Sequence, residues 1–129
     1  MDPEGARVTV TRFFTSMAAG EWDAMAACVA PDVVRVGPFR DVKVGRDDYR
    51  DFLATTIGAL EGYRLDLQRV WTDGERAVAQ LSETMVVDGR PRRTDEAIVC
   101  DLGADGLIRR VEVYLQRGYF PGDEPDIDR

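Results

Sequence analysis

Apolar residues near the start of the chain recur with the period of a helix. They are spaced by three or four positions, which places them on one helical face: Val10, Phe13, Phe14, Met17 and Ala18. Asp2-Pro3-Glu4 is typical of a helix start, because it offers a capping side chain, a proline in the first turn and an acidic group at the positive end of the helix dipole. Gly20 can end this helix, and a second, short helix is predicted for residues 22–27.

The next segments predict a strand and a third helix. Pro31-Asp32 should break the short helix, and the β-branched run 33–36 is typical of a strand. Residues 45–60 return to the helical spacing, with Asp47 as the expected cap. Their apolar stripe is predicted to face the core: Tyr49, Phe52, Leu53, Thr56, Ile57 and Leu60.

After Gly62 the apolar pattern changes to a period of two, which predicts strands. Glycine-containing turns separate the segments with this pattern: residues 63–71, 76–87, 93–102 and 107–116. Short turns join antiparallel neighbours, so these strands should form a meander. The whole pattern predicts an α+β fold, with three N-terminal helices packed on one face of a strongly curved antiparallel sheet. We expect a single domain over residues 1–120 and a loose, acidic tail over 121–129.

Composition narrows the class of partner. A net charge of −7 disfavours nucleic acid, because phosphate binding requires a cationic surface. No apolar run reaches the length that crosses a bilayer, and the polar, acidic start is unlike a secretory signal. We therefore expect a cytoplasmic location without membrane association. The densest basic group, Arg90, Arg92 and Arg93, is interpreted as a solvated hairpin end rather than an anion site.

The chain contains no histidine. This excludes histidine-activated nucleophiles and the commonest zinc sites, and we expect neither a metal nor a cofactor. The two cysteines, Cys28 and Cys100, are too few for a recognisable disulfide framework and are expected to be reduced, buried thiols. Acid–base chemistry would fall to carboxylates, tyrosines, thiols or Lys43, the only lysine.

Three segments resemble one known family. The first two helices and the first strand of ketosteroid isomerase are similar to the segment RFFTSMAAGEWDAMAACVAPDVVRVGPF. Its third helix is similar to GRDDYRDFL, and its last hairpin is similar to VVDGRPRRTDEAIVCDLGADGLIRRVEVYL. Over about residues 10–116 the chain resembles the NTF2-like superfamily, in its ketosteroid isomerase and SnoaL-type polyketide cyclase branch. The resemblance implies a cone-shaped fold. Together with the uncovered face of the sheet, it also implies a homodimer.

The residues that catalyse the ketosteroid isomerase reaction have no counterpart here. That family uses a tyrosine and a protonated aspartic acid as oxyanion donors and a second aspartate as the base. The resemblance places these groups at Phe13, Ile98 and Gly37, respectively. Related cyclases and epoxide hydrolases use aspartates near the final strand, where this chain has Val113 and Gln116. The resemblance therefore implies that the usual chemistry is absent.

Strand alternation predicts which side chains face the inside of the cone. With side chains from the helices, they form a mostly apolar lining, suited to a hydrophobic small-molecule ligand. The helices are expected to contribute Phe13, Met17, Val29, Leu53 and Ile57, and the strands Met85, Ile98, Cys100, Val111, Val113 and Leu115. Glu83 shares the inward parity and is the candidate base, because burial raises the pKa of a carboxyl group. The alternatives are that Glu83 pairs with an arginine across the sheet, or that the assigned parity is off by one.

Two further polar residues are candidates for the same site. Asp41 follows the turn at Gly37-Pro38 and would be the nearest replacement for the missing base. Tyr49 could donate a hydrogen bond at the mouth of the cone, although a tyrosine on a helix face also serves as packing. Both are therefore included with Glu83 as candidate catalytic residues.

Other polar and aromatic residues are interpreted as structural. Glu96 shares the inward parity but lies near a hairpin end among arginines, which favours a salt bridge at the rim. Asp95 and Glu112 should face outward, onto the open face of the sheet. Trp22 and Trp71 are expected in the core.

Three functions fit these observations. The first is a cofactor-free enzyme of the isomerase, cyclase or hydratase type, acting on a hydrophobic carbonyl compound with Glu83 as base. The second is a non-catalytic binding protein for a hydrophobic small molecule, because Phe13 and Ile98 suit the cone to holding a ligand. The third is a dimeric interaction domain with a filled cone. Analogy with the resembling branch favours the enzyme.

Overall fold

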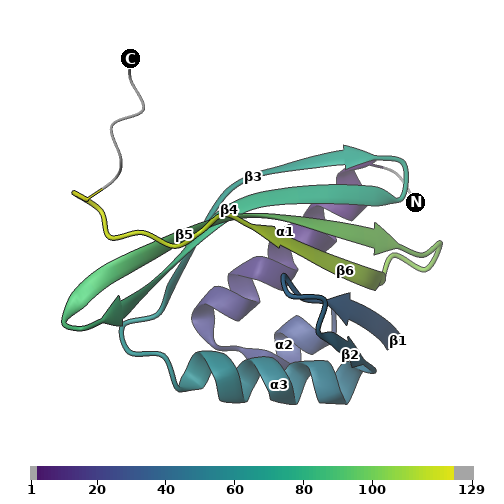
Figure 1. The fold of residues 1–129 in the computed structure, drawn as a ribbon. Helices are drawn as coiled ribbons and strands as arrows, with labels where there is room; N and C mark the ends of the chain where they lie inside the picture. The colour runs from purple at the N-terminus through teal and green to yellow at the C-terminus, as the bar shows by residue number, and fades with distance from the viewer. Residues whose placement is uncertain (1–2, 124–129) are drawn as a thin grey trace.

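The computed structural model describes residues 3–123, in which six strands form one curved sheet and three helices lie against one face of it (Figure 1). The elements are α1 (Pro3–Ala19), α2 (Trp22–Ala26), β1 (Val29–Val36), β2 (Val42–Val44), α3 (Arg46–Gly58), β3 (Arg64–Asp73), β4 (Arg76–Val87), β5 (Arg90–Leu102) and β6 (Ile108–Leu115). This is the predicted α+β arrangement, although two strands precede α3. No helix in this range is long and apolar enough to cross a membrane.

The sheet has the order β2-β1-β6-β5-β4-β3. Strands β3 to β6 form the predicted antiparallel meander. The β4–β5 hairpin turns at Asp88 and Gly89, whose φ angles of 53° and 72° are those of a tight hairpin turn. Two pairings were not predicted: β1 runs parallel to β6, and β2 adds an edge strand to β1.

Strand β1 begins four residues earlier than predicted, at Val29 instead of Val33. Pro31 lies inside it, which is possible because the pairing with β6 is irregular between Val29 and Val34. Val29 was grouped with the helical side chains, and this was wrong: it is the first residue of β1 and is only 1% exposed.

The apolar face of α1 packs along β3 and β4 and forms the centre of the core. Phe13 and Phe14 are fully buried, with ring centroids 4.9 Å apart in an edge-to-face arrangement. The ring of Phe13 also lies 6.2 Å from that of Tyr49 on α3. Both cysteines are free thiols in this core, as predicted. Aromatic side chains from two helices therefore pack together within a mostly aliphatic core.

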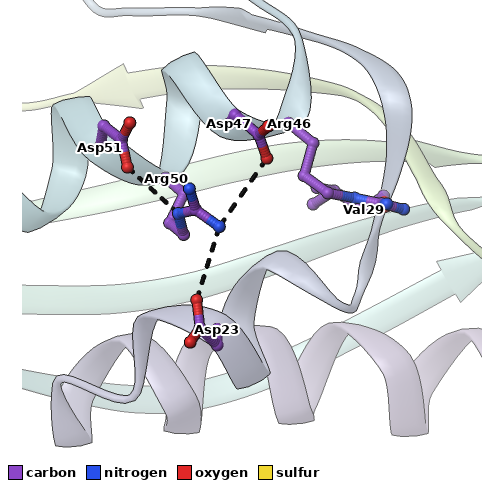
Figure 2. A network of polar contacts seen from close by, with 6 residues as sticks. All are labelled: Asp23, Val29, Arg46, Asp47, Arg50 and Asp51. Atoms are coloured by element: carbon purple, nitrogen blue, oxygen red, sulfur yellow. Dashed lines mark hydrogen bonds and ion pairs between the residues drawn. The ribbon is translucent and has the colours of Figure 1, made fainter.

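Two arginines connect α3 to its neighbours (Figure 2). Arg46 donates a hydrogen bond from Nε to the carbonyl oxygen of Val29 in β1, at 3.1 Å. Arg50 forms ion pairs with three carboxylates, one on α2 and two on α3, at 3.5, 3.7 and 3.1 Å: Asp23, Asp47 and Asp51. Exposed ion pairs contribute little stability each. Arg46 thus links α3 to β1, and the Arg50–Asp23 pair links α3 to α2.

The start and the inner stripe of α3 differ from the prediction in two places. Asp47 is not the cap: that position is taken by Gly45, whose φ of 98° favours glycine, and no side chain caps the helix. Thr56 was expected on the inner stripe but is exposed, whereas Tyr49 and Leu53 are buried. Leu60 lies beyond the end of the helix.

Charged residues on the outer face of the sheet lie where they were predicted. Asp95 and Glu112 pair with arginines of their own strands, at 2.9 and 2.8 Å. At the exposed β4–β5 hairpin, Arg90 pairs with Asp123 at 2.5 Å. The rest of the predicted acidic tail, residues 124–129, lies outside the described range.

Trp71 was predicted in the core and is instead 47% exposed on the outer face. The cause is an irregularity in β3 between Leu67 and Arg69, which shifts the alternation by one residue. Val70 consequently points into the core, and Trp71 points away from it. Trp71 and Tyr114 border a hollow of about 420 Å³ on this outer face. Trp22, by contrast, packs against the core.

Truncating Phe13 tests the described core. Phe13→Ala should lower the free energy of unfolding by about 3–5 kcal/mol, because it removes a fully buried ring. Phe39→Ala is the matched control: Phe39 is 85% exposed, so we expect a change within about 0.5 kcal/mol. Urea unfolding followed by circular dichroism measures both, and two equally small changes would contradict the described packing.

Candidate functional site

The inner face of the sheet becomes less buried toward the β4–β5 hairpin. On β4, Ala77, Ala79 and Leu81 are buried, whereas Glu83 and Met85 are half-buried. We call the half-buried end, near the hairpin, the open end of the cone, and the other the closed end. Polar side chains on this face are therefore least costly at the open end.

The residues predicted to line the pocket divide by burial. Most belong to the packed core: Phe13, Met17, Val29, Leu53, Ile98, Cys100 and Val111. The others are half-buried or, in one case, 38% exposed: Ile57, Met85, Val113 and Leu115. The side chains of the buried residues contact other protein side chains, because the rings of Phe13 and Phe14 occupy the space beneath the sheet. The closed end is thus filled by protein side chains.

Glu83 and Glu96 are neighbours on the inner face, where its buried part meets the open end. Glu83 lies opposite Thr94, and Glu96 lies opposite Leu81. This register makes the two glutamates diagonal neighbours on one face of adjacent strands. The two carboxyl groups are close enough for Glu83 to raise the pKa of Glu96, through hydrogen bonding and through its charge. The inward parity assigned to Glu83 is confirmed.

The predicted rim salt bridge of Glu96 is wrong. Glu96 is only 6% exposed and forms no ion pair within residues 3–123. Because β5 begins at Arg90, Glu96 lies in the middle of the strand, away from the hairpin end. Burial raises the pKa of Glu96 to about 10, the hydrogen bond and charge of Glu83 act in the same direction, and the charge of Arg35 opposes them. Glu96 is therefore the carboxyl group that holds the proton at neutral pH.

Tyr63, directly before β3, donates a hydrogen bond from its hydroxyl to Oε2 of Glu83. No arginine pairs with Glu83 within the described residues, so the alternative of a cross-sheet ion pair is excluded there. Burial raises the pKa of Tyr63, and the charge and hydrogen bond of Glu83 raise it further. The phenol keeps its proton, and Glu83 is thus bonded to two protonated groups.

A second polar pair occupies the space beside Gly37. Arg35, a β1 residue only 9% exposed, donates from Nη1 to Oδ2 of Asp41 at 2.8 Å. A Cβ added at Gly37 would overlap the Asp41 carboxylate and lie 2.6 Å from Nη1 of Arg35. Burial raises the pKa of Asp41, but its backbone hydrogen bonds and the charge of Arg35 bring it below the ordinary value. Asp41 is thus an ionised partner of Arg35.

Tyr49 was predicted at the mouth of the cone and instead lies inside it. It is 2% exposed, because its position on α3 faces the sheet, and its ring packs beside Phe13. Burial raises the pKa of Tyr49, while the nearby charge of Arg35 lowers it and that of Glu83 raises it. Tyr49 is therefore a protonated phenol beneath the polar groups.

A family model for the SnoaL-like domain matches residues 10–111. The protein belongs to the SnoaL-like domain family. Its fold is similar to that of a predicted ketosteroid isomerase from Kribbella flavida, with a TM-score of 0.80, 25% sequence identity and coverage of 98% of this chain and 87% of that chain. A predicted polyketide cyclase from Xanthomonas campestris pv. campestris shares 25% identity at a TM-score of 0.74, with 87% and 90% covered.

More distant structures share the NTF2-like fold of this SnoaL-like protein. An LEH-like epoxide hydrolase from M. tuberculosis superimposes with a TM-score of 0.77 at 17% identity, over 88% of this chain and 84% of that chain. A comparison with curated protein sequences finds no match. The resemblance to the NTF2-like superfamily and its ketosteroid isomerase and cyclase branch is confirmed.

Two polar residues of this SnoaL-like site, Arg35 and Tyr63, were missed from the sequence. Arg35 shares a strand face with the buried Val33, and a charged residue at such a position is unusual enough to be a signal. Tyr63 is two positions before Leu65, which lies opposite Glu83. Residues two positions apart in an extended segment point to the same side. The Tyr63 phenol could therefore have been predicted near the Glu83 carboxylate.

The raised pKa of Glu96 predicts how stability depends on pH. The ordinary pKa of Glu96 is 4.5, and its pKa in the native state is about 10. At a pH between these two values, Glu96 keeps its proton in the native state and has released it in the unfolded state. The free energy of unfolding should therefore fall as the pH rises through this window, by at most about 1.4 kcal/mol per pH unit from this group. Urea unfolding at pH 6, 7 and 8 measures the slope.

Two variants isolate the contribution of Glu96. Glu96→Gln should remove most of the slope, because the amide cannot titrate. Asp95→Asn alters the neighbouring, outward-facing residue and should retain it. A wild-type slope no steeper than that of Glu96→Gln would show that Glu96 does not hold the additional proton.

Proposed function

We propose that the protein is a cofactor-free enzyme of the isomerase, cyclase or hydratase type, acting on a hydrophobic carbonyl compound at the open end of the cone. The observation that carries this proposal is the Glu83–Glu96 pair, in which one carboxyl group keeps its proton beside another that accepts a hydrogen bond from Tyr63. A proton acceptor and a proton donor in one partly desolvated space are the parts that general acid–base catalysis requires.

The environments of the two glutamates assign their roles. Glu83, half-buried at the open end, acts as the base and removes a proton from the carbon beside the substrate carbonyl. The electrons of that C–H bond form a carbon–carbon double bond, and the carbonyl oxygen receives the negative charge. Glu96 donates a hydrogen bond to that oxygen, which stabilises the charge as it develops.

The fate of the enolate distinguishes the reaction types. If Glu83 returns its proton to a different carbon, the product is an isomer. If the enolate carbon attacks a second carbonyl in the same molecule, a carbon–carbon bond closes a ring, and the new alkoxide takes the proton from Glu83. Both routes leave the glutamates as they began, so neither requires a cofactor.

Support also comes from where the polar groups lie relative to the family pattern. Ile98 stands at the position of the protonated aspartic acid, and Glu96 lies two residues earlier on the same strand face. Asp41 and Arg35 occupy the space in which a side chain at Gly37 would begin. Two solved structures at 25% identity are a predicted ketosteroid isomerase and a predicted polyketide cyclase, which are enzymes of the proposed types.

Exchange of acidic protons tests the proposal without the natural substrate. In D2O, the wild type should accelerate deuterium incorporation next to the carbonyl of 2-tetralone, a flat hydrophobic ketone, as followed by NMR. Glu83→Gln should slow this exchange about 100-fold or more, since the base is lost. Glu96→Gln should slow it less, because the amide still donates a hydrogen bond.

The control for this experiment is Glu112→Gln, which removes a carboxylate from the outer face and should exchange like the wild type. Urea unfolding confirms that each variant is folded. If 2-tetralone binds and no variant or wild type exchanges it, the enzyme proposal fails. The apolar residues Phe13 and Ile98 would then favour a binding protein for hydrophobic small molecules.

A further inference from the structure

Two cations face each other beside the candidate site. Arg35 on β1 and Lys43 on β2 are direct cross-strand partners, so their side chains lie on the same face of the sheet. Both are positioned over the ring of Phe52 on α3, with the guanidinium carbon 5.1 Å and the ammonium nitrogen 4.7 Å from its centroid. The three side chains form one compact group at the β2 edge of the cone.

The charges in this group do not cancel. Like charges directly opposite each other in a sheet are unfavourable, and on a chain with a net charge of −7 such a pair is unexpected. Asp41 neutralises one positive charge through its ion pair with Arg35. Lys43 forms no ion pair within residues 3–123. Arg35, Lys43 and Asp41 therefore carry one uncompensated positive charge.

The electrostatic effect of this group reaches the acid–base pair. The charge of Arg35 lowers the pKa of both Glu96 and Tyr49. Asp41 is bonded to Nη1 only, and a guanidinium offers five N–H donors. Arg35 thus has donors remaining beyond those that Asp41 uses.

We propose that Arg35 and Lys43 form a subsite for a carboxylate group, with the ring of Phe52 beneath it. This inference rests on the proposed function and names its substrate class: a hydrophobic carbonyl compound that also carries a carboxylate. A single uncompensated charge matches one carboxylate better than a phosphate ester, which carries about −1.5 to −2 at neutral pH. The carboxylate anchors the substrate at the β2 edge, and its carbonyl extends toward Glu83 and Glu96.

Three aromatic ligands of one shape test the subsite. Isothermal titration calorimetry compares 2-naphthoate with its neutral counterpart 2-naphthamide and with 2-naphthyl phosphate. The wild type should bind 2-naphthoate at least about tenfold more tightly than 2-naphthamide, and this ratio should decrease as salt screens the charges. Phosphate binding tighter than carboxylate binding would overturn the assignment of the subsite.

The variants address the role of Lys43. Lys43→Met keeps the apolar stem and removes the charge, so the preference for 2-naphthoate should fall to about twofold or less. Arg40→Met is the matched control: it removes a cation from the same hairpin, but one whose charge acts on Tyr114 of the outer face. It should leave the preference unchanged. A preference that survives in Lys43→Met, or is absent from the wild type, would overturn the proposal.

Lys43 is the only lysine of the chain, which permits a direct readout. Acetylation with an activated ester followed by mass spectrometry reports the reactivity of this one side chain, with the amino terminus as an internal control. 2-Naphthoate should slow the acetylation of Lys43 several-fold more than the same concentration of 2-naphthamide. Equal protection by both ligands would contradict the carboxylate subsite.

The two proposals fail in different ways. Exchange of 2-tetralone that depends on Glu83, together with no preference for 2-naphthoate, would reject the subsite and leave the enzyme intact. A preference for 2-naphthoate that depends on Lys43, without any exchange, would reject the substrate assignment and the enzyme together, and would leave a carboxylate-binding protein.

Discussion

Two carboxyl groups held side by side in a poorly hydrated space cannot both lose their protons without bringing two negative charges together. This constraint acts on Glu83 and Glu96, and the other polar groups of the site adjust to it. Glu96 keeps its proton, Tyr63 donates to Glu83, and the charge of Arg35 limits the rise in the pKa of Glu96. The register of β4 and β5 makes the two residues neighbours, and their different burial and the hydrogen bond from Tyr63 divide two chemically identical side chains into a donor and an acceptor.

The curvature of the sheet determines where such a pair can exist. Aromatic rings of α1 and α3 fill the closed end, where an unpaired polar group would cost several kcal/mol. Toward the β4–β5 hairpin the inner face is half-buried, and Glu83 lies in this part, beside the buried Glu96. Arg35 on β1 and Lys43 on the edge strand β2 add two cations next to Phe52. The charge of Arg35 acts on Glu96, one member of the acid–base pair.

Regular alternation made much of this predictable from the sequence. The meander of β3 to β6 and the inward parity of Glu83 follow from a period of two, which the pleat of a strand imposes. Glu96 has the same parity, but the arginines near it in the sequence led to the prediction of a salt bridge at the rim. One of them, Arg93, points to the opposite face of the strand and pairs with Asp95. Trp71 was misplaced because one irregularity in β3 reverses the alternation after Leu67. The pairing of Arg35 with Asp41 depends on a loop in which Arg40 has a φ of 64°, and no local sequence pattern indicates that geometry.

The loss of the three ketosteroid isomerase positions from the sequence need not mean the loss of their functions from the fold. Acid–base catalysis depends on where a proton donor and an acceptor lie in space, and a cone presents several inward positions within a few ångströms of one substrate. Moving a carboxyl group by two residues along one strand keeps it on the same face, as Glu96 illustrates relative to Ile98. The space at Gly37 is likewise filled from Asp41, four residues later. Phe13 and Ile98 are apolar and buried, so the core around them has no polar group to satisfy there, and both glutamates lie nearer the β4–β5 hairpin.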